Sequence, residues 1–575
     1  MSAILPARHW NMPGPAPAEA ASLARTLGLP PIAGQLLTAR GFITTDEVTA
    51  FLDPSPGRLH RPDSLPDISV ATDRVIAALE RNEAVCIHGD YDVDGISATA
   101  LLVTCLERLG GRVGYYLPHR ETEGYGLAPN SISFCRELGA TLLLTVDCGS
   151  SDHDVVLAAR SAGIAVVITD HHEPPAQLPE ALAVVNPKRP DSAYPFRELA
   201  GVGVAFKLAW SILAALGRER TELTDLLDLV GLGTIADVVP MLDENRILAR
   251  LGVNAIRNTR RLGLKALLTR TGIANRPLSD RDVGFIIAPR LNAAGRVDHA
   301  RTGVRLLLTN DPAEADRLAD RLEQNNRERR RIESRVLDAA IARVEELATD
   351  GRRVLVAADT EWPAGVLGLV ASRLAERYYR PAFVIGVRDG IGKGSGRSIP
   401  GFDLYEALAG CAGQLLAFGG HRQAGGLSIA ADRIPQFADA LNKRAETLPE
   451  ELFRPTLDID AVLNPKELEP DLTEFLRRLE PFGPGNKEPL FAAFGLEVMG
   501  IPRRVGNNHL KFRVRSGDGS LPAIAWGRSS NLPDLEPGRP GSLDICFSVD
   551  RNPKPGFEAG IIVRDLRTSN GPDQA

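Results

Sequence analysis

The sequence predicts two α/β domains joined by a long helix and followed by a small β domain. Short apolar runs alternate with helix-like segments over residues 71–310 and again over 351–450, a pattern typical of parallel sheets with crossover helices. A charged stretch over 311–350 has helical character, and short alternating runs separated by Gly, Asn and Pro turns fill 455–568. The length of 575 residues accommodates roughly three to four domains.

Composition limits the classes of protein to which the chain can belong. Hydrophobic residues make up 44% and charged residues 24%, which excludes collagen, a disulfide-stapled miniprotein and a mostly disordered chain. We find no apolar run near the ~18 residues that span a bilayer, and no signal-like apolar core at the N-terminus. The scattered cysteines form no CxxC pair, so we expect no zinc ribbon and a reducing cytoplasm. Because the net charge is -6, nucleic-acid binding would need a local basic groove.

Each element of the first α/β domain is predicted from its local pattern. Residues 1–70 are rich in Pro and Ala with short helical patches, and they predict an N-terminal appendage. Within 71–310, buried apolar runs indicate strands and helical spacing of apolar residues indicates helices. The expected strands are Ala84–Ile87, Thr141–Val146, Ala165–Ile168 and Ala183–Val185, and the expected helices include Ser97–Leu109 and Val155–Ala162.

The linking helix and the later domains are predicted in the same way. Asp311 and Pro312 indicate a helix start, because Asp caps helices and Pro suits the first turn. About 38 helical residues would span ~57 Å, enough to bridge two domains, although a charge run alone indicates only a solvated helix face. The expected strands beyond it are Val354–Ala357, Ala382–Ile385, Leu510–Val514 and Leu521–Trp526.

An acidic loop follows the first predicted strand. His88, Asp90, Asp92 and Asp94 lie within seven positions, and such crowding of carboxylates is costly unless a cation neutralises it. Alternate residues of an extended loop point the same way, so the aspartates can converge. The pattern lacks the glutamate of an EF-hand, and the alternative is a solvated acidic turn. Because strand ends in α/β sheets bind ligands, we expect a metal site here.

Further candidate ligands lie in three other clusters. Asp147 follows a second strand, although an aspartate there can also cap a helix. Asp170, His171 and His172 follow a third strand; adjacent histidines point to opposite sides, which suits one metal ligand and one phosphate contact. Asp237 stands among apolar residues, and a buried carboxylate requires a cation or several hydrogen bonds. Oxygen and imidazole ligands without thiolates suit Mn²⁺ or Mg²⁺, and a doubled site can hydrolyse phosphodiesters.

These clusters, in this order, resemble the DHH phosphoesterase superfamily, and further motifs resemble the RecJ family within it. The likeness runs from about residue 20 to 565 and includes the C-terminal β domain. One departure is Pro363, where RecJ proteins usually carry His, and we assign this position no role. The motifs are His88-xxx-Asp92-x-Asp94, Asp170-His171-His172, Pro118–Leu127, Ile287–Arg296, Gly394–Ser398, Gly419–Gly425 and Pro481–Asn486.

The resemblance implies a centre that holds two divalent cations, Mn²⁺ or Mg²⁺. Asp147 would bridge the cations, whereas Asp90 and Asp170 would orient the ligands without contacting a cation themselves. His172 would stabilise charge on the scissile phosphate, and the cations would activate water, so that no protein nucleophile is required. The implied ligands are His88, Asp92 and Asp147 for one cation, and Asp94, Asp147, His171 and Asp237 for the other.

The resemblance also implies a DHH domain over 71–310, a DHHA1 domain over 351–450 that closes over it, and an OB-fold barrel over 455–568. Glycine loops near Gly394 and Gly419 would present N–H groups to phosphate, although such loops are more often plain turns. Tyr125 would stack on a base or pack within its own loop. The expected substrate-binding residues are Arg120, Tyr125, Arg290, Asn292, Arg296, Ser395, Arg397 and His421, with Arg503, Arg504, Lys511, Arg513 and Trp526 as candidates on the barrel.

The implied function is that of a single-strand-specific exonuclease, which degrades DNA from 5′ to 3′ into 5′-mononucleotides during recombination and repair. A single-strand-binding protein and a helicase are the implied protein partners. The alternative is a DHH phosphodiesterase for nanoRNA or cyclic dinucleotides, but such enzymes usually lack the domain expected over 455–568. A non-catalytic nucleic-acid-binding protein on the same scaffold is another alternative, but such a protein would have lost the metal ligands, which this sequence keeps. An NTP-driven motor would need a GxxxxGK[ST] motif, which the sequence lacks.

Overall fold

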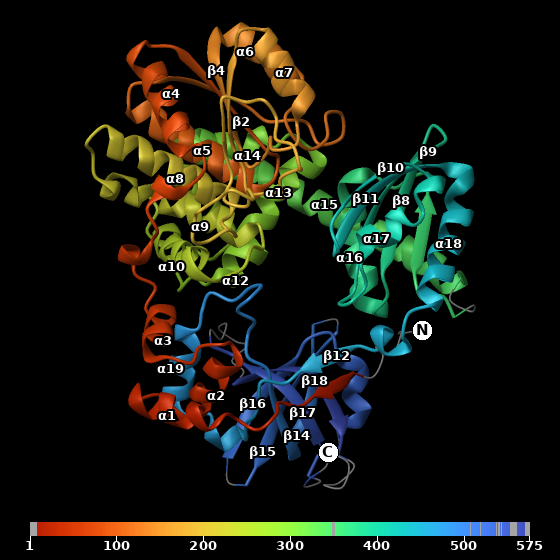
Figure 1. Ribbon diagram of the computed structural model, residues 1–575. Coiled ribbons are helices and arrows are strands. Elements are labelled where there is room, and N and C mark those ends of the chain that lie inside the picture. Colours follow the sequence, from red (N-terminus) through yellow and green to blue (C-terminus); the bar gives the residue numbers. More distant parts are fainter. Residues whose placement is uncertain are drawn as a thin grey trace.

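Two α/β units and a C-terminal barrel make up the molecule. The computed structural model describes residues 8–347 and 351–569, apart from 507, 518, 536, 539–540, 542 and 552–559. In Figure 1 the first α/β unit lies above the barrel, and the second lies to one side, beyond helix α15. This arrangement confirms the predicted fold class, whereas the domain boundaries stay predictions.

The first unit is built on a parallel sheet with the strand order β3-β2-β4-β5-β6. Apart from the edge strand β3, its strands are buried on both faces, which explains why their sequences are mostly apolar. In β4, Leu142 and Leu144 pack into the core shared with α4, α5 and α8, whereas Leu143 packs with α6 and α7 on the other face. The elements are α4 Ile68–Glu80, β2 Ala84–Gly89, α5 Val93–Arg108, β3 Arg112–Tyr116, α6 Asn130–Leu138, β4 Ala140–Val146, α7 His153–Ser161, β5 Ala165–Thr169, β6 Ala183–Val185 and α8 Gly201–Ala215.

Helices continue the first unit and lead into the long helix α15. The N-terminal part of α15 packs on the first unit through Leu318 and Leu322, and its C-terminal part packs on α16 (Ala364–Tyr378) through Val336 and Val344. The helix thus connects the two α/β units as predicted, and positions 348–350 of the predicted linker lie outside the described residues. The helices are α9 Leu227–Ala236, α10 Asp243–Arg257, α11 Leu262–Arg270, α12 Asp280–Asp282, α13 Ala288–Val297, α14 Arg301–Leu308 and α15 Pro312–Leu347.

The second unit has a mixed sheet with the order β10-β11-β9-β8-β7. Gly394 and Gly396 lie in β9, which pairs with β8 on one side and β11 on the other. Their N–H groups therefore serve the sheet, and the interpretation of this segment as a phosphate-binding loop is wrong. The elements are β7 Leu355–Asp359, α16 Ala364–Tyr378, β8 Ala382–Arg388, β9 Ile391–Arg397, α17 Leu404–Ala409, β10 Leu415–Gly420, β11 Ala424–Ala430 and α18 Ile434–Glu446.

The C-terminal sheet has the order β13-β14-β15-β16-β18-β17, and a pairing of β14 with β17 closes it into a barrel. The N-terminal segment, expected as an appendage, packs on this barrel: Leu36 and Phe51 share a core with Phe475 and Phe547. The elements are β1 His9–Asn11, α1 Ala18–Thr26, α2 Pro31–Ala39, α3 Thr45–Leu52, β12 Thr456–Asp458, β13 Ala461–Val462, α19 Pro470–Arg478, β14 Phe491–Val505, β15 His509–Ser516, β16 Gly519–Ala525, β17 Leu543–Val549 and β18 Ile561–Thr568.

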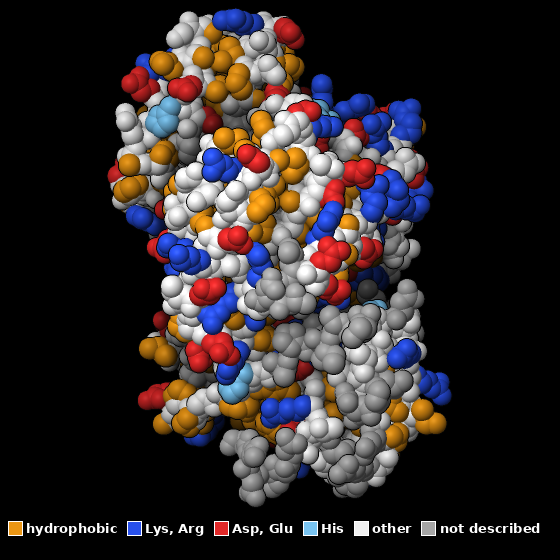
Figure 2. Space-filling model, turned by 90° about the vertical axis from the view of Figure 1, so that its right-hand side faces the viewer, with side chains coloured by type: hydrophobic (Ala, Val, Ile, Leu, Met, Phe, Trp, Pro, Cys, Tyr) orange, Lys and Arg blue, Asp and Glu red, His pale blue; other side chains and the backbone are white. Residues whose placement is uncertain are grey.

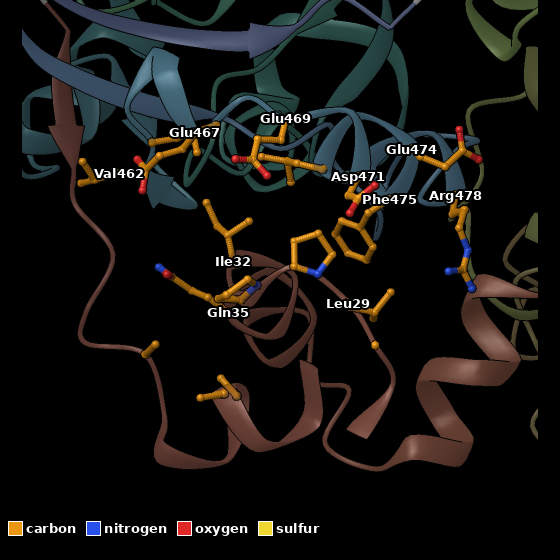
Figure 3. Close-up of a pocket in the computed structure, with 18 of the residues that line it drawn as sticks. Leu29, Ile32, Gln35, Val462, Glu467, Glu469, Asp471, Glu474, Phe475 and Arg478 are labelled. Carbon is orange, nitrogen blue, oxygen red and sulfur yellow. The ribbon is translucent and has the colours of Figure 1, made fainter. Parts of the chain in front are cut away.

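The surface helps to narrow the search for a substrate site. A groove of about 1280 Å³ lies between the N-terminal helices and α19, with Ile32 and Phe475 facing it (Figure 3). Carboxylates of Glu467, Glu469 and Asp471 line its rim, so this groove is unsuited to DNA phosphates. Acidic and basic side chains are intermixed on the face in Figure 2. Among the described residues, no helix is long and apolar enough to cross a membrane.

Candidate metal centre and substrate site

Strand order places the acidic loops of the first unit together. After β2 the chain crosses to β3 at the sheet edge and then returns to β4 on the other side of β2. The carboxyl ends of β2 and β4 therefore form a topological switch point, where open α/β sheets bind ligands. The acidic loop that begins at Asp90 leaves β2 here, Asp147 follows β4, and Asp170 follows β5. The sheet thus brings three of the predicted clusters to one edge.

The first group of converging ligand atoms contains Asp94, Asp147, His171 and Asp237. His171 Nε2 lies 3.0 Å from Asp147 Oδ1, 3.6 Å from Asp237 Oδ2 and 3.9 Å from Asp94 Oδ2. Asp147 Oδ1, His171 Nε2 and Asp237 Oδ2 are buried and have no hydrogen-bond partner. Four predicted ligands therefore point at one small volume.

Helices α8 and α9 fix this group in place. The N–H groups of Gly201 and Val202, at the start of α8, donate to the two oxygens of Asp94 at 2.6 and 2.9 Å. A methyl group at Gly201 would lie 2.4 Å from Asp147 Oδ1, and one at Gly233 of α9 would lie 2.5 Å from Asp94 Oδ1. Both glycines are required because the helices approach the carboxylates so closely.

A second group joins Asp90, Asp92 and Asp147, whose ligand atoms lie within 4.8 Å of one another. Asp92 is the N-cap of α5 and accepts hydrogen bonds from the N–H groups of Asp94 and Gly95 at 2.9 and 3.2 Å. Asp90 is predicted only to orient other ligands, yet its Oδ1 is buried and unpartnered. Asp90 is therefore a direct ligand candidate by geometry.

His88 is placed differently from its expected role as a ligand. Its Nε2 accepts a hydrogen bond from the Ala128 N–H at 3.1 Å, and its Nδ1 lies 3.6 Å from Cys148 Sγ. Among the described residues, the groups that could hold a cation do not include this histidine. Both ring nitrogens face protein groups, so the structure leaves His88 outside the converging set.

Asp170 holds the pair of histidines that follows it. Its Oδ1 accepts from the His171 and His172 N–H groups at 2.8 and 3.2 Å and lies 2.8 Å from His172 Nδ1. Its Oδ2 accepts from the Ser150 N–H at 3.0 Å. These contacts suit the orienting role expected of Asp170, and they leave the half-buried imidazole of His172 beside the metal groups.

Asn186 is a site residue that sequence reasoning missed. Its side-chain amide donates to Ser150 Oγ at 3.1 Å and to the His172 carbonyl oxygen at 2.9 Å. It follows β6 directly, in the same way that the acidic clusters follow β2, β4 and β5. A polar residue directly after each of these strands was the signal that could have identified it.

Burial dominates the electrostatics of the centre. Burial, followed by repulsion from Asp92, raises the pKa of Asp94 to about 7. Burial and neighbouring carboxylates also raise the pKa of Asp90, Asp147 and Asp237 well above the ordinary value. Burial lowers the pKa of His171 to about 3, so that its imidazole stays neutral and keeps a lone pair for a cation.

The residues present fit divalent cations. Buried carboxylates that repel one another, with unpartnered oxygens beside a neutral imidazole, lack the positive charge that would stabilise them. Hard cations such as Mn²⁺ and Mg²⁺ take oxygen and imidazole ligands, whereas no cysteine thiolate belongs to these groups of described residues. The donor set therefore matches the predicted cations.

Three of the predicted substrate-binding arginines form a positive cluster beside this centre. Burial, together with the charges of neighbouring arginines that include Arg120 and Arg397, lowers the pKa of Arg296 to about 10. The Arg120 guanidinium lies over the Tyr91 ring at 4.7 Å from the centroid. Arg397 and Ser395 share one face of β9 and approach α16, where a methyl group at Gly368 would lie 2.8 Å from Arg397 Nη2. A cluster of this kind is the local positive charge that nucleic-acid binding would need in a chain with a net charge of -6.

The remaining predicted contacts have other partners. Arg290 donates to Glu323 Oε2 and to the Ile286 carbonyl, both at 2.6 Å, so it ties α13 to α15. Asn292 accepts from the Val93 N–H at 3.2 Å and thus supports the acidic loop. His421 is exposed in the turn after β10. Tyr125 is 53% exposed, and its hydroxyl lies 2.9 Å from His172 Nδ1, which places it at the centre.

Family models match three consecutive parts of the chain. The N-terminal domain of the DHH family matches residues 84–234, the DHHA1 domain matches 351–447 and the RecJ OB domain matches 459–558. The parallel sheet, the buried aspartates and the Asp170-His171-His172 motif thus define a protein of the DHH class.

Relatives specify the family within that class. The single-stranded-DNA-specific exonuclease RecJ of Dickeya dadantii is 40% identical over 508 residues, which are 84% of this chain and 87% of the relative. The crystal structure of RecJ in complex with Mn²⁺ from Thermus thermophilus matches with a TM-score of 0.81 and 30% identity, over 98% of this chain and 80% of that chain. The crystal structure of the same protein in complex with Mg²⁺ matches with a TM-score of 0.77 and 30% identity, over 98% of this chain and 79% of that chain. The chain belongs to the RecJ family.

Proposed function

We propose that this protein is a single-stranded-DNA-specific exonuclease that degrades DNA from 5′ to 3′ and releases 5′-mononucleotides, in recombination and repair. The observation that carries the proposal is the convergence of ligand atoms from Asp94, Asp147, His171 and Asp237 at the switch point of the sheet. Membership of the RecJ family supplies the substrate class, because the relatives are named for single-stranded DNA.

The proposed centre holds two cations. Asp94, Asp147, His171 and Asp237 form one site. Asp92 and Asp147 belong to the other, which Asp90 completes in place of the expected His88. Bound Mn²⁺ or Mg²⁺ would lower the pKa of water and offset charge on the scissile phosphate. The protein's part is positioning: Asp170 fixes both histidines, and His172 would face the scissile phosphate.

The arginine cluster supports recognition of a terminal phosphate. Burial, followed by the charge of Arg120, lowers the pKa values of both Arg296 and Arg397, so an anion bound beside these guanidinium groups would stabilise the cluster. Ser395 lies on the same face of β9 as Arg397. We assign this cluster to the 5′-phosphate, which would set the polarity of digestion.

The barrel offers a surface for the incoming strand. Trp526 is 45% exposed, which argues against a core role, and its ring lies 4.7 Å from the His509 ring. An exposed aromatic ring on an OB fold can stack on bases. A single-strand-binding protein and a helicase as partners, and a cytoplasmic location, stay predictions.

The test uses purified protein with Mn²⁺ or Mg²⁺ and single-stranded DNA labelled at either end. Matching duplex and a dinucleotide serve as comparison substrates, and EDTA removes the cations. We expect early release of labelled mononucleotide from the 5′ end of single strands only, and none with EDTA. Cleavage confined to the dinucleotide would assign the protein to the small-substrate phosphodiesterases instead.

A further inference from the structure

A loop of the C-terminal domain touches the chain directly after a proposed metal ligand. The loop consists of residues 481–486, and the Pro484 carbonyl oxygen accepts a hydrogen bond of 2.8 Å from the Met241 N–H. Met241 comes four residues after Asp237, and its side chain is buried. The contact joins two units that are more than 200 positions apart in the sequence. The C-terminal domain therefore reaches the segment that carries a proposed ligand.

The segment between the ligand and the loop is under backbone strain. Asp237 is the C-cap of α9, and the next residue, Val238, has φ of 63°. A β-branched residue in the left-handed region is a true outlier, and it persists only where surrounding contacts hold it. Val238 is 65% exposed, so its own side chain contributes little packing. The restraint therefore comes from the residues on either side of it, and the Asp237 N–H already donates to the Gly233 carbonyl of α9 at 3.0 Å.

Asn245 supplies part of that restraint and connects it to a second ligand. Its side-chain amide donates to the Pro240 carbonyl at 3.1 Å, and its Oδ1 accepts from the Ala200 N–H at 3.3 Å. Ala200 is the N-cap of α8, whose first N–H groups hold Asp94. The start of α10 thus contacts the supports of both Asp237 and Asp94.

The loop itself is held rigidly against α10. The Asn486 amide donates to the Leu479 and Pro481 carbonyls, both at 2.8 Å. Arg246 of α10 is buried and donates to the same Leu479 carbonyl at 2.7 Å and to the Phe51 carbonyl at 2.9 Å. The Leu479 carbonyl, just before the loop, thus accepts hydrogen bonds from both α10 and the loop.

Gly483 and Gly485 allow the loop to approach this closely. A methyl group at Gly483 would lie 2.6 Å from Met241 Cγ, and one at Gly485 would lie 2.9 Å from Leu242 Cδ1. Gly485 has φ of 74°, a backbone conformation that favours glycine whatever surrounds it. Gly483 does not have a positive φ, so its backbone conformation does not require glycine. Close contact with Met241 is thus the feature that a side chain at position 483 would break.

We infer that the 481–486 loop positions Asp237, so that the metal centre is complete only when the C-terminal domain is docked on the first unit. Gly483, Pro484 and Met241 are positioning residues that act through Asp237. The inference rests on the proposed metal role of Asp237. It gives the C-terminal domain a part in cation binding in addition to its proposed contact with DNA.

The test measures the Mn²⁺ affinity of the full chain by electron paramagnetic resonance of free Mn²⁺. We expect Gly483→Ala to weaken Mn²⁺ binding by about 10-fold, the loss typical of residues that support a ligand. The control Gly413→Ala places a methyl group where nothing lies within 4 Å, and should bind as the wild type does. In the double variant Met241→Ala/Gly483→Ala, the side chain that the new methyl group would strike is absent. This double variant should therefore bind Mn²⁺ as tightly as Met241→Ala alone.

The outcomes separate this inference from the proposed function. Wild-type affinity in Gly483→Ala, or a double variant no better than Gly483→Ala, overturns the inference. Asp237→Asn tests the site itself: if it binds Mn²⁺ as the wild type does, the proposed ligand role and the inference fall together. If Asp237→Asn weakens binding and Gly483→Ala does not, only the inference fails.

A second measurement needs no loop variant and covers the case in which Gly483→Ala does not fold. Coupling is reciprocal, so Mn²⁺ binding must stabilise the docked loop as much as docking stabilises Mn²⁺ binding. We expect Mn²⁺ to slow amide hydrogen exchange at Met241 and in 481–486 of the wild type, and to do so less in Asp237→Asn. Unchanged exchange in the wild type contradicts the inference.

Discussion

The two α/β units use their sheets in opposite ways. In the first, carboxylates and histidines follow the ends of parallel strands and meet in a buried centre, where Asp147 is shared by two groups. In the second, glycines alternate along β9, and a methyl group at Gly396 would lie 2.5 Å from the Phe383 ring. The opposite face of β9 presents Ser395 and Arg397 beside α16.

This difference indicates a division of labour. The first unit places acidic groups where they repel one another until a cation arrives, which suits chemistry at a phosphate. The second unit contributes Arg397 to a positive cluster that Arg120 and Arg296 complete from the first unit. Variants of the first unit should therefore affect the chemical step and cation binding, and variants of the second should affect binding of DNA.

The largest effect is expected for Asp147→Asn. The change keeps the shape of the side chain but removes the charge that both cation sites share. Hydrolysis of single-stranded DNA should fall by more than the roughly 100-fold typical of residues that only support a ligand. The rate constant kcat and the Mn²⁺ affinity, measured together, check this prediction.

A stability control accompanies that variant. Burial and the carboxylates of Asp94 and Asp92 raise the pKa of Asp147, so its ionised form is destabilising without a cation. Metal-free Asp147→Asn should therefore unfold at the same temperature as the wild type or a higher one at pH 8. A lower unfolding temperature would mean that lost activity reflects misfolding, and the comparison of units would lose its main support.

The next effect is the pH dependence of cation binding. The pKa of Asp94 is raised to about 7, so at pH 6 a proton competes with the cation, and above pH 7 it does not. Displacing this proton should make Mn²⁺ binding at least about 10-fold tighter at pH 8 than at pH 6, because the pKa values of Asp90, Asp147 and Asp237 are raised as well. Titration calorimetry at both pH values checks the sign; equal affinities would contradict the raised pKa.

Arg397→Ala should separate recognition from chemistry. Loss of one charged contact to a phosphate should raise KM for 5′-phosphorylated single strands by about 10-fold and leave kcat nearly unchanged. Strands with a 5′-hydroxyl should be affected much less. Arg290→Ala is the matched control, because Arg290 is paired with Glu323 and should affect stability more than KM. A fall in kcat alone for Arg397→Ala would break the division between the units.

The smallest effect is expected for Tyr125→Phe. The change removes the hydroxyl beside His172 Nδ1 but keeps the exposed ring. Loss of one hydrogen bond should cost about 1 kcal/mol, a roughly five-fold change in kcat/KM. Tyr125→Ala should add a loss of affinity for DNA if the ring stacks on a base. If the two variants have equal affinity for DNA and equal kcat/KM, Tyr125 acts only through the contact of its hydroxyl with His172.

Much of the first unit could be predicted from the sequence because its signals are local. The strands β2, β4 and β5 are mostly apolar, and polar ligand candidates follow each of them at once. Strand β3 was missed, since Arg112–Tyr116 contains a glycine and is only partly buried at the sheet edge. That Asp90 points a free oxygen into the centre while His88 turns to Ala128 depends on side-chain orientation, which sequence spacing does not specify.

Other features depend on contacts between distant segments. Glycines at every second position of β9 have low strand propensity, and close packing against the side chains of neighbouring strands explains them: Ile385 lies over Gly392, Leu427 over Gly394 and Phe383 over Gly396. The N-terminal helices show no local sign that they pack on the barrel. Arg246 has the sequence appearance of a surface residue, yet it is buried and donates to carbonyl groups of two other segments.

Helix α15 sets the rotational phase between the two units. It is one continuous helix of 36 residues, fixed to the first unit at one end and to α16 at the other. Each inserted residue would turn everything beyond it by about 100° and advance it by about 1.5 Å. A single insertion near its middle would thus swing Arg397 around the helix axis, away from Arg296. Point substitutions on its solvated face leave that phase intact, so the length of α15 is under a stricter constraint than its sequence.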